Sequence, residues 1–528
     1  MNESATALRD RAALAPDDAA RPIDAAHARS WYEIVTTPAA GSFSLARRVL
    51  FILAFALMIA ALNLLGSSNP TGRERLLASA IIALSAVPAW LWMDGQDPGL
   101  PLMPFFGLIF TTYYAAPLFI VRDYRTMWVA APISHLYVAR ALELILLGLA
   151  CVMAGYYGPQ RLLLQEVLPR VTMRWRRVGN IKFYGIMFSI AGLTVYLIDR
   201  MVEIPASVAQ LATFASDLCL IGMCILLVLQ LIGRLDRATG LFLWLILVPL
   251  RFWFGLGSGL TSQGLIVAVT LIFTYAAIRR RIPWLVLMIG GAAFFILRPA
   301  EGAFRLMTWS GGIMQQASQL DQTRMLAQLV GQTVTGLFAG EDGATDELIQ
   351  ISLRRLDTDT LTFADVLRDT PGIVPYWYGA TYYPLLFKPI PRFIWPGKPA
   401  EITGQSFGHR YGLLDQNNSS TSFNLPQLIE GYINFGVPGL VVSMFLFGML
   451  YRATQVLFVH PGMGLGAVVG AVYTCVNLLQ IESAASLVLG STLWGLIFLV
   501  LLNLLIQSAE LVPHPSASAI GTARTTSP

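Results

Sequence analysis

Residues able to do chemistry at a membrane surface gather between Arg298 and Glu430, most densely in the run LFKPIPRFIWPGKP from Leu386 to Pro399. Prolines hold such a run extended and remove backbone donors, whereas Tyr and Trp supply flat faces with polar tips. A surface of this kind suits sugars or lipid headgroups. Its basic residues are Arg354, Arg355, Arg368, Lys388, Arg392, Lys398, His409 and Arg410. Its aromatic residues include Tyr376, Trp377, Tyr378, Tyr382, Tyr383, Phe387, Phe393 and Trp395. An inert spacer is the alternative interpretation.

The rest of the chain consists of apolar blocks about as long as transmembrane helices. Of the 528 residues, 55% are hydrophobic and 13% charged, against about 25% charged in a soluble domain. We therefore expect an all-α polytopic membrane protein. Twelve spans are predicted: Arg48–Leu65, Leu76–Met93, Leu100–Val121, Leu136–Tyr157, Ile181–Ile198, Ser207–Ile232, Leu241–Phe254, Leu260–Ile278, Ile282–Leu297, Tyr432–Tyr451, Met463–Leu479 and Leu487–Ile506.

These spans divide the chain into five predicted parts. A membrane domain of nine helices (46–297) precedes one large extracytoplasmic loop (298–430), and three further helices (431–508) follow it. Residues 1–45 and 509–528 are expected to be disordered cytoplasmic tails, because neither contains a continuous apolar run. A short amphipathic piece around Trp31 and Tyr32 that touches headgroups is the alternative for the first tail.

Basic residues favour one orientation. With a cytoplasmic N-terminus, the inner connections carry fourteen Arg and Lys residues and the short outer connections carry five. This positive-inside bias places the large loop outside, in the periplasm of a Gram-negative bacterium. The segment Arg161–Arg177 alternates leucine and arginine, which favours an interfacial helix on an anionic inner leaflet; a solvated basic connector is the alternative.

A few charged residues fall inside the apolar blocks. Arg140 and Glu143 are three residues apart, so we expect them to pair on one helix face. Asp217 lies in the sixth predicted span, where a charge costs about 2.5–3.5 kcal/mol and normally faces a cavity or a partner. Arg251 precedes a glycine-rich outer turn and is interpreted either as held beneath that turn or as snorkelling to the headgroups.

Composition also excludes some functions. No compact basic domain is present, which argues against nucleic-acid binding. The four cysteines, Cys151, Cys219, Cys224 and Cys475, all lie in apolar blocks and imply neither disulfides nor a metal site. We expect no metal and no cofactor.

One region resembles a known family. The run IPRFIWPGKP, then GQSFGHRYG, then TSFNLPQLIEGYINFG leading into a span, is similar to the signature region of bacterial oligosaccharide repeat-unit polymerases, the Wzy-type O-antigen and exopolysaccharide polymerases. The motifs cover about Tyr376 to Gly436. Members of that family often carry a serine-arginine at an outer helix end, where this chain has GLGSGLTSQG with Arg251 well before it.

The resemblance implies transfer of a growing glycan from undecaprenyl diphosphate onto the next lipid-linked repeat unit at the periplasmic face of the inner membrane. A diphosphate leaving group needs fixed positive charge, and the residues expected to supply it are Arg392, Lys398 and Arg410. The attacking hydroxyl needs a base, for which His409 and Glu430 are the predicted catalytic residues and Asp415 a weaker choice. Sugar contacts are expected at Tyr378, Tyr382 and Trp395.

Each assignment has an alternative. Arg392 is alternatively a headgroup tether, His409 a surface histidine, and Glu430 a cap for the helix predicted to begin near Tyr432. At the level of the whole chain, an O-antigen ligase would share this plan, and a lipid-linked oligosaccharide flippase is a third hypothesis. Expected partners are undecaprenyl-diphosphate-linked glycans, membrane lipids, a chain-length regulator and a flippase.

Overall fold

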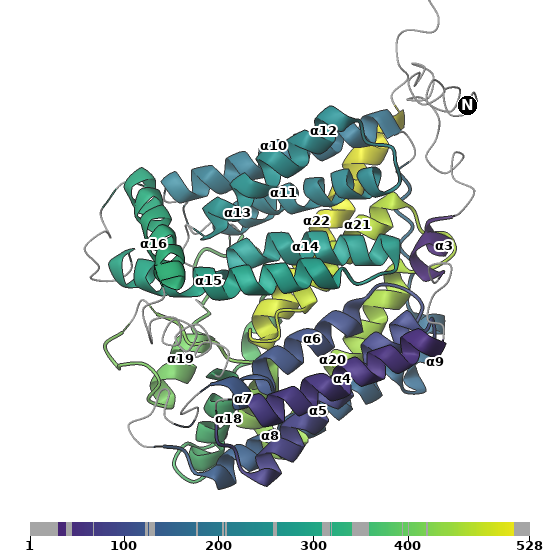
Figure 1. Cartoon of the computed structure of the whole chain (residues 1–528). Coiled ribbons are helices and arrows are strands. Elements are labelled where there is room, and N and C mark those ends of the chain that lie inside the picture. Colours follow the sequence, from purple (N-terminus) through teal and green to yellow (C-terminus); the bar gives the residue numbers. More distant parts are fainter. Residues whose placement is uncertain are drawn as a thin grey trace, which may run out of the picture.

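The regular structure of the chain is helical throughout the part that the computed structural model describes (Figure 1). An all-α fold is therefore confirmed for that part. The described residues are 30–37, 45–66, 68–121, 125, 132–175, 178–202, 205, 208–256, 261–308, 317, 319–339, 358–392, 394–399, 401–418 and 421–511.

The helices follow one another with short connections. The first part of the chain forms α3 (Trp31–Thr36), α4 (Leu45–Leu65), α5 (Gly72–Met93), α6 (Leu102–Tyr114), α7 (Pro117–Ile120), α8 (His135–Tyr157) and α9 (Gln160–Val167). The middle part forms α10 (Val178–Met201), α11 (Ala209–Leu231), α12 (Arg237–Phe242), the π-helix η3 (Leu243–Leu247), α13 (Val248–Leu256), α14 (Thr261–Arg279), α15 (Trp284–Thr308) and α16 (Gln319–Ala339). The last part forms α18 (Thr358–Asp369), the 3₁₀ turn η4 (Tyr383–Leu386), α19 (Thr403–Arg410), α20 (Gln427–Phe458), α21 (Leu465–Leu478) and α22 (Ala485–Leu511).

All twelve predicted spans fall on these helices. Among the described residues, ten helical stretches are long and apolar enough to cross a membrane, and the remaining two predicted spans coincide with shorter apolar helices, Trp284–Ala293 and Leu465–Leu478. A helix satisfies its own backbone donors and acceptors, which is what the bilayer interior demands. The chain is accordingly a multi-pass membrane protein.

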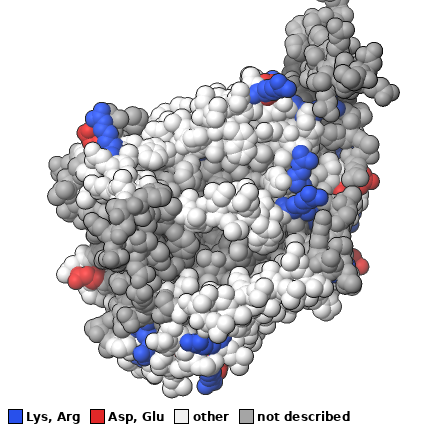
Figure 2. Space-filling model, in the orientation of Figure 1, with Lys and Arg blue, Asp and Glu red and all other residues white. Residues whose placement is uncertain are grey.

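The face of the molecule drawn in Figure 2 has few charged side chains in its middle. In Figure 2 the blue and red residues gather near the two ends of the helices, and a broad uncharged surface separates them. One end carries α16, α18 and α19 and is called the loop end; the end that carries α3 and α9 is called the opposite end (Figure 1). This distribution is typical of a belt that contacts lipid tails.

The N-terminal segment departs from the prediction. Residues 1–45 were expected to be disordered, but α3 begins with a capping box between Ser30 and Glu33. Trp31 and Val35 are buried in the main hydrophobic core, and α3 contacts α14. The prediction was therefore wrong for α3, whose apolar face packs on protein; residues 1–29 lie outside the described part of the chain.

The opposite end is held by a buried polar network. Asp97, in the connection between α5 and α6, accepts hydrogen bonds from the hydroxyl groups of Tyr156 (3.4 Å) and Tyr157 (3.3 Å) and pairs with Arg452 at 3.5 Å. Arg280 donates to the backbone carbonyls of Trp92 and Gly99. Because α5, α8, α14 and α20 all meet in this network, it fixes their relative positions.

The charged residues inside the apolar blocks have partners. Arg140 and Glu143 pair at 3.0 Å as predicted, and Arg73 joins them. Arg251 is buried, with its guanidinium 3.7 Å from the centre of the Tyr196 ring. The snorkelling alternative for Arg251 is therefore wrong, since its charge lies among helices rather than at the surface.

The predicted basic helix is shorter than expected. α9 covers Gln160–Val167 and exposes Leu162, Leu163 and Val167. Beyond it the chain is extended, and Val171 donates to the carbonyl of Leu457. Pro169 explains this ending, because proline cannot continue a helix.

The predicted loop begins later than expected and contains helices. α15 continues past Leu297 and through Pro299 to Thr308, and α16 then runs across the loop end of the bundle (Figure 1). Within the predicted loop, α18 runs from Thr358 to Asp369; residues 340–357 are outside the described part. α18 is largely buried against α8 and α6.

Candidate functional site at the loop end

The site is organised around a reversal inside α20. Phe435 and Gly436 have non-helical backbone angles, and Gly436 has a φ of +65° that glycine tolerates best. A β-carbon on Gly431 would lie 3.0 Å from the Cα of Leu440, although nine residues in one straight helix span about 13 Å. Residues 427–434 therefore form a separate short helix, called the return helix, which folds back onto the rest of α20.

The return helix is buried and joins three parts of the loop end. Gln427 donates from its backbone and side-chain amides to the carbonyls of Ile481 and Gln480. At its other end, the backbone amide of Trp377 donates to the carbonyl of Ile433. Phe363 of α18 packs edge-on against Tyr432. These contacts place residues 360–380 beside the connection between α21 and α22.

Glu430 is the buried carboxylate of the return helix. Its side chain is completely buried, and Oε2 accepts a hydrogen bond of 2.6 Å from the backbone amide of Ala485, the first residue of α22. A carboxylate is stabilised at a helix N-terminus. Glu430 was predicted as an alternative to cap a helix beginning near Tyr432. That prediction is wrong, because α20 begins at Gln427 and Glu430 caps α22 instead.

The basic residues between Lys388 and Pro399 form a cross-braced turn, called the cationic turn. Arg392 donates to the carbonyls of Lys398 (2.9 Å) and Pro399 (3.3 Å), while the Lys398 amine donates to the carbonyl of Ile390 (2.9 Å). Burial lowers the pKa of Lys398, and so do the nearby charges of Lys388 and Arg392. The structure thus brings two predicted diphosphate ligands together and adds Lys388.

The cationic turn is attached to α22 by residues that the sequence analysis missed. The carboxylate of Glu401 pairs with the Lys388 amine and accepts a hydrogen bond from the Ser486 hydroxyl. Trp494 also donates to the carbonyl of Lys388 at 2.8 Å. Glu401 interacts electrostatically with Glu430 as well. Glu401 could have been found in the sequence as a carboxylate two residues after the GKP motif. Nothing in the sequence pointed to its partner Ser486, which is 85 residues away.

Apolar side chains surround the cations on the exposed surface. Leu386 is 75% exposed, Ile394 65% and Trp395 41%. These residues are separated from the cations by only a few positions, and Phe387 lies beneath them, in edge contact with Trp395. A surface that combines fixed positive charge with exposed apolar groups suits an anionic group attached to a lipid chain.

The other predicted residues are distributed differently. One ring nitrogen of His409, Nε2, lies 2.9 Å from the carbonyl of Asn418, and Gln416 donates to the His409 carbonyl. Arg410 donates to the carbonyl of Pro375 and lies 4.7 Å from the centre of the Trp377 ring. Arg410 is therefore engaged at the C-terminal end of the return helix, and no described hydrogen bond or ion pair links it to the cationic turn.

The three predicted sugar contacts differ in exposure. Tyr378 is 74% exposed and Trp395 partly exposed, whereas Tyr382 is mostly covered beside Glu430. Burial, with a smaller contribution from Glu430, raises the pKa of Tyr382 well above its usual range. Tyr382 therefore remains a neutral hydrogen-bonding group, and Asp415 lies in the turn after α19, where it accepts from the Asn417 amide.

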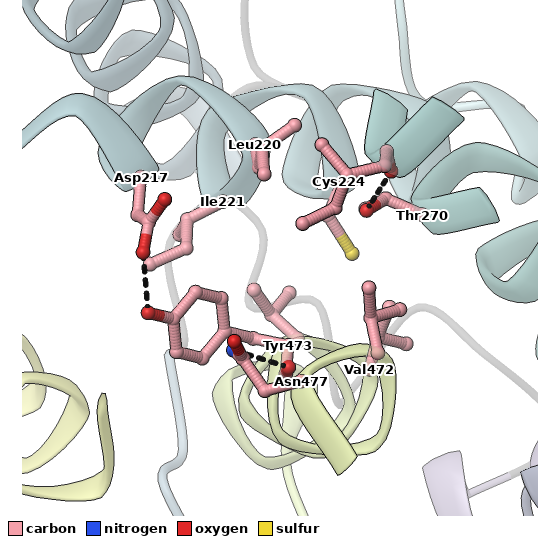
Figure 3. A pocket seen from close by; sticks show the side chains of 11 residues that line it. Asp217, Leu220, Ile221, Cys224, Thr270, Val472, Tyr473 and Asn477 are labelled. Atoms are coloured by element: carbon pink, nitrogen blue, oxygen red, sulfur yellow. Dashed lines mark hydrogen bonds between the residues drawn. The ribbon is translucent and has the colours of Figure 1, made fainter. Parts of the chain in front are cut away.

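A second polar site lies inside the bundle, between α11, α14 and α21 (Figure 3). Asp217 accepts a 2.7 Å hydrogen bond from the Tyr473 hydroxyl, so it has both the cavity and the partner that were predicted. The cavity, with a volume of about 20 Å³, has room for about one water molecule. It is too small for a substrate, and we assign the candidate functional site to the loop end.

No curated protein and no solved structure matches this sequence. One family model does match, over residues 123–513, which include most of the bundle together with α16, α18, α19 and the return helix. The chain therefore belongs to the family described as a domain of unknown function, DUF8712.

Proposed function

We propose that this protein polymerises oligosaccharide repeat units carried on undecaprenyl diphosphate, at the periplasmic face of a bacterial inner membrane. The growing glycan leaves its lipid diphosphate and is joined to the next lipid-linked unit. The motifs from Tyr376 to Gly436 resemble those of such polymerases. The loop end would then face the periplasm.

The observation that carries the proposal is the cationic turn. Arg392 and Lys398 bond to backbone carbonyls and form no ion pair with any carboxylate among the described residues. The turn therefore keeps a net positive charge despite the nearby Glu401, and exposed Leu386, Ile394 and Trp395 are close to it in the chain. A bound diphosphate would neutralise the positive charge of the cationic turn, and the polyprenyl chain would contact the apolar side chains and the bilayer.

The reaction needs one bond to break and one to form. The bond between the anomeric carbon and the diphosphate oxygen breaks, the acceptor hydroxyl oxygen bonds to that carbon, and the hydroxyl proton passes to a base. Fixed cations beside the departing diphosphate stabilise the negative charge that it gains. Lys388, held by Glu401, adds a third cation to this group.

As the base we propose Glu401, in preference to His409 and Glu430. Glu430 is completely buried and His409 is bonded to a backbone carbonyl, whereas the Glu401 carboxylate lies next to the cationic turn and is bonded to Lys388 and Ser486. A base must reach the acceptor hydroxyl directly or through one water. Of the three groups, Glu401 is nearest to the proposed leaving group.

Deletion of the gene tests the proposal. A strain that lacks a polymerase should carry glycans with a single repeat unit, and the wild-type gene should restore the ladder of longer chains. Long polymer left on its lipid carrier would instead indicate a ligase, and loss of every periplasmic repeat unit would indicate a flippase. An unchanged glycan profile would contradict all three.

A further inference from the structure

Tyr378 is an exposed residue at the loop end with a strained backbone conformation. Its φ is +49°, in the left-handed region that side chains with a β-carbon rarely adopt, and the following Gly379 has a φ of +89°. Such a conformation persists only when surrounding contacts impose it, and it often marks a functional position. Tyr378 is nevertheless 74% exposed, so packing of its own side chain does not account for the strain.

The strain is imposed from beneath by the return helix. The backbone amide of Tyr378 donates to the carbonyl of Asn434 (3.2 Å), and that of Gly379 donates to the Asn434 side-chain oxygen (2.8 Å). The Asn434 amide in turn donates to the Thr381 hydroxyl (2.7 Å) and the Glu430 carbonyl (2.8 Å). Asn434 is completely buried. It therefore clamps the turn and directs Tyr378 outward.

Other aromatic groups surround Tyr378. The centre of the Tyr376 ring lies 6.3 Å from that of Tyr378 and 6.3 Å from that of Tyr432. Phe435, half exposed, lies against Gly379, and Arg410 stacks on Trp377. These residues form an aromatic platform with one fixed guanidinium. Its residues 376–378 precede Lys398 by about twenty positions in the chain.

We propose that this platform, centred on Tyr378 and Tyr376, binds sugar rings of the growing glycan while its diphosphate occupies the cationic turn. The inference rests on the proposed function. The flat apolar face of a sugar ring packs on an aromatic face, and tyrosine and arginine side chains bond to its hydroxyl groups. A glycan held there stays with the protein between transfers, so the platform raises polymer length.

Substitutions at Tyr378 separate binding from folding. Tyr378→Ala should raise the Kd for glycan roughly twofold to tenfold, as expected for loss of one aromatic contact. Tyr378→Phe should keep most of the affinity. Tyr378→Gly removes the ring and also relieves the backbone strain, so it should lose affinity while raising the Tm. A residue with a purely structural role would not lose binding and gain stability together.

The probe is the surface polysaccharide of the host strain, released from its lipid by mild acid and titrated against full-length protein in lipid nanodiscs. Ile373→Ala is the matched control, because Ile373 is 77% exposed beside the platform but has no aromatic face. In cells, Tyr378→Ala should shorten the most abundant chain length, and Ile373→Ala should leave it unchanged.

Wild-type affinity and chain length in Tyr378→Ala and Tyr378→Gly would overturn the platform, provided that the wild-type gene restores polymer in the deletion strain. The platform would likewise be overturned if Tyr378→Ala lost binding to anionic or neutral lipid vesicles but still bound the polysaccharide. Tyr378 would then contact lipid headgroups. An unchanged glycan profile in the deletion strain would instead mean that the proposed function has failed.

Discussion

Two groups of cations, one at each end of the bundle, have different kinds of partner. At the opposite end, Arg452 pairs with Asp97 and Lys182 pairs with Asp236. At the loop end, Arg392, Lys398 and Arg410 bond to backbone carbonyls and form no ion pair with a described carboxylate. Arg452 and Lys182 therefore help to hold the fold together, whereas Arg392, Lys398 and Arg410 leave positive charge available at the loop end.

The difference has an electrostatic consequence. A carbonyl group is a dipole without net charge, so it orients a cation but does not neutralise it. Two opposite unit charges 4 Å apart attract by about 4 kcal/mol near a protein surface. An anionic ligand that binds to the cationic turn can gain this interaction. Lys388 differs from the other cations of the turn, because its charge is already paired with the carboxylate of Glu401.

The largest expected difference between the two ends is in thiol labelling, where a cysteine introduced at one end should react and a cysteine introduced at the other should not. A β-carbon at Gly372 meets no other atom within 4 Å, whereas one at Gly404 would lie 2.5 Å from the Phe423 carbonyl, so Gly372→Cys is the better reporter. It should react with a membrane-impermeant maleimide when only the outer membrane is permeabilised. Leu163→Cys, on exposed α9, should react only after the inner membrane is opened.

The reverse labelling pattern would place the cationic turn in the cytoplasm and contradict a periplasmic role. The wild-type chain is the control, because its four cysteines lie within helices and three of them are buried.

Removal of a free cation should abolish polymer while the protein still folds. Arg392→Ala should lower polymerisation on the order of tenfold or more, as expected for loss of a charge-assisted contact. Arg392→Lys should recover only part of the activity, because it keeps the charge but not the planar donor geometry. Polymer is measured by glycan gel, normalised to the amount of protein in the membrane.

Arg324→Ala is the matched control at the same end, since its side chain is 68% exposed on α16; it should polymerise normally. Near-normal chain length in Arg392→Ala would remove this residue from the site.

Removal of a paired cation should affect stability instead. Arg452→Ala leaves Asp97 buried without its cation, which should lower the free energy of unfolding by roughly 3–5 kcal/mol, with little change in activity per folded molecule. Thermal unfolding in detergent measures this loss of stability. Lys182→Ala, at an exposed pair, should change stability by about 1 kcal/mol or less.

The defect of Arg452→Ala should depend on pH. Burial raises the pKa of Asp97 above its ordinary value, against the opposing effect of Arg452. The folded state thus binds the proton more tightly than the unfolded state, and protonation of Asp97 stabilises the fold, a contribution lost as pH rises through the folded pKa. Without Arg452 the pKa rises further, so the stability deficit should shrink as pH falls. A deficit that grew in acid would contradict this account.

Similarly small effects are expected at Glu430 and His409. Glu430→Gln keeps an oxygen that can accept from Ala485, and His409→Ala loses one contact with Asn418, so each should cost about 1 kcal/mol of stability. Turnover per folded molecule should stay close to wild type. If either variant folds normally but loses turnover, that residue is the base and the assignment to Glu401 is wrong.

Local composition determined which segments form apolar helices. A span needs about 20 apolar residues whatever its neighbours are, so all twelve predicted spans coincide with helices. Close spacing also brought Arg392 and Lys398 into one turn, because six positions in a proline-rich segment cannot separate them far.

Tertiary structure alone decided which segments meet. Glu430 bonds to Ala485, 55 residues later, and Glu401 bonds to Ser486, 85 residues later, because α20 reverses at Phe435 and Gly436 and brings the loop onto the start of α22. Likewise α3 folds onto α14 although its six residues resemble a plain tail in sequence. Such pairings depend on the path of the whole chain, and hydrophobic periodicity records only which face of each helix is covered, not by which partner.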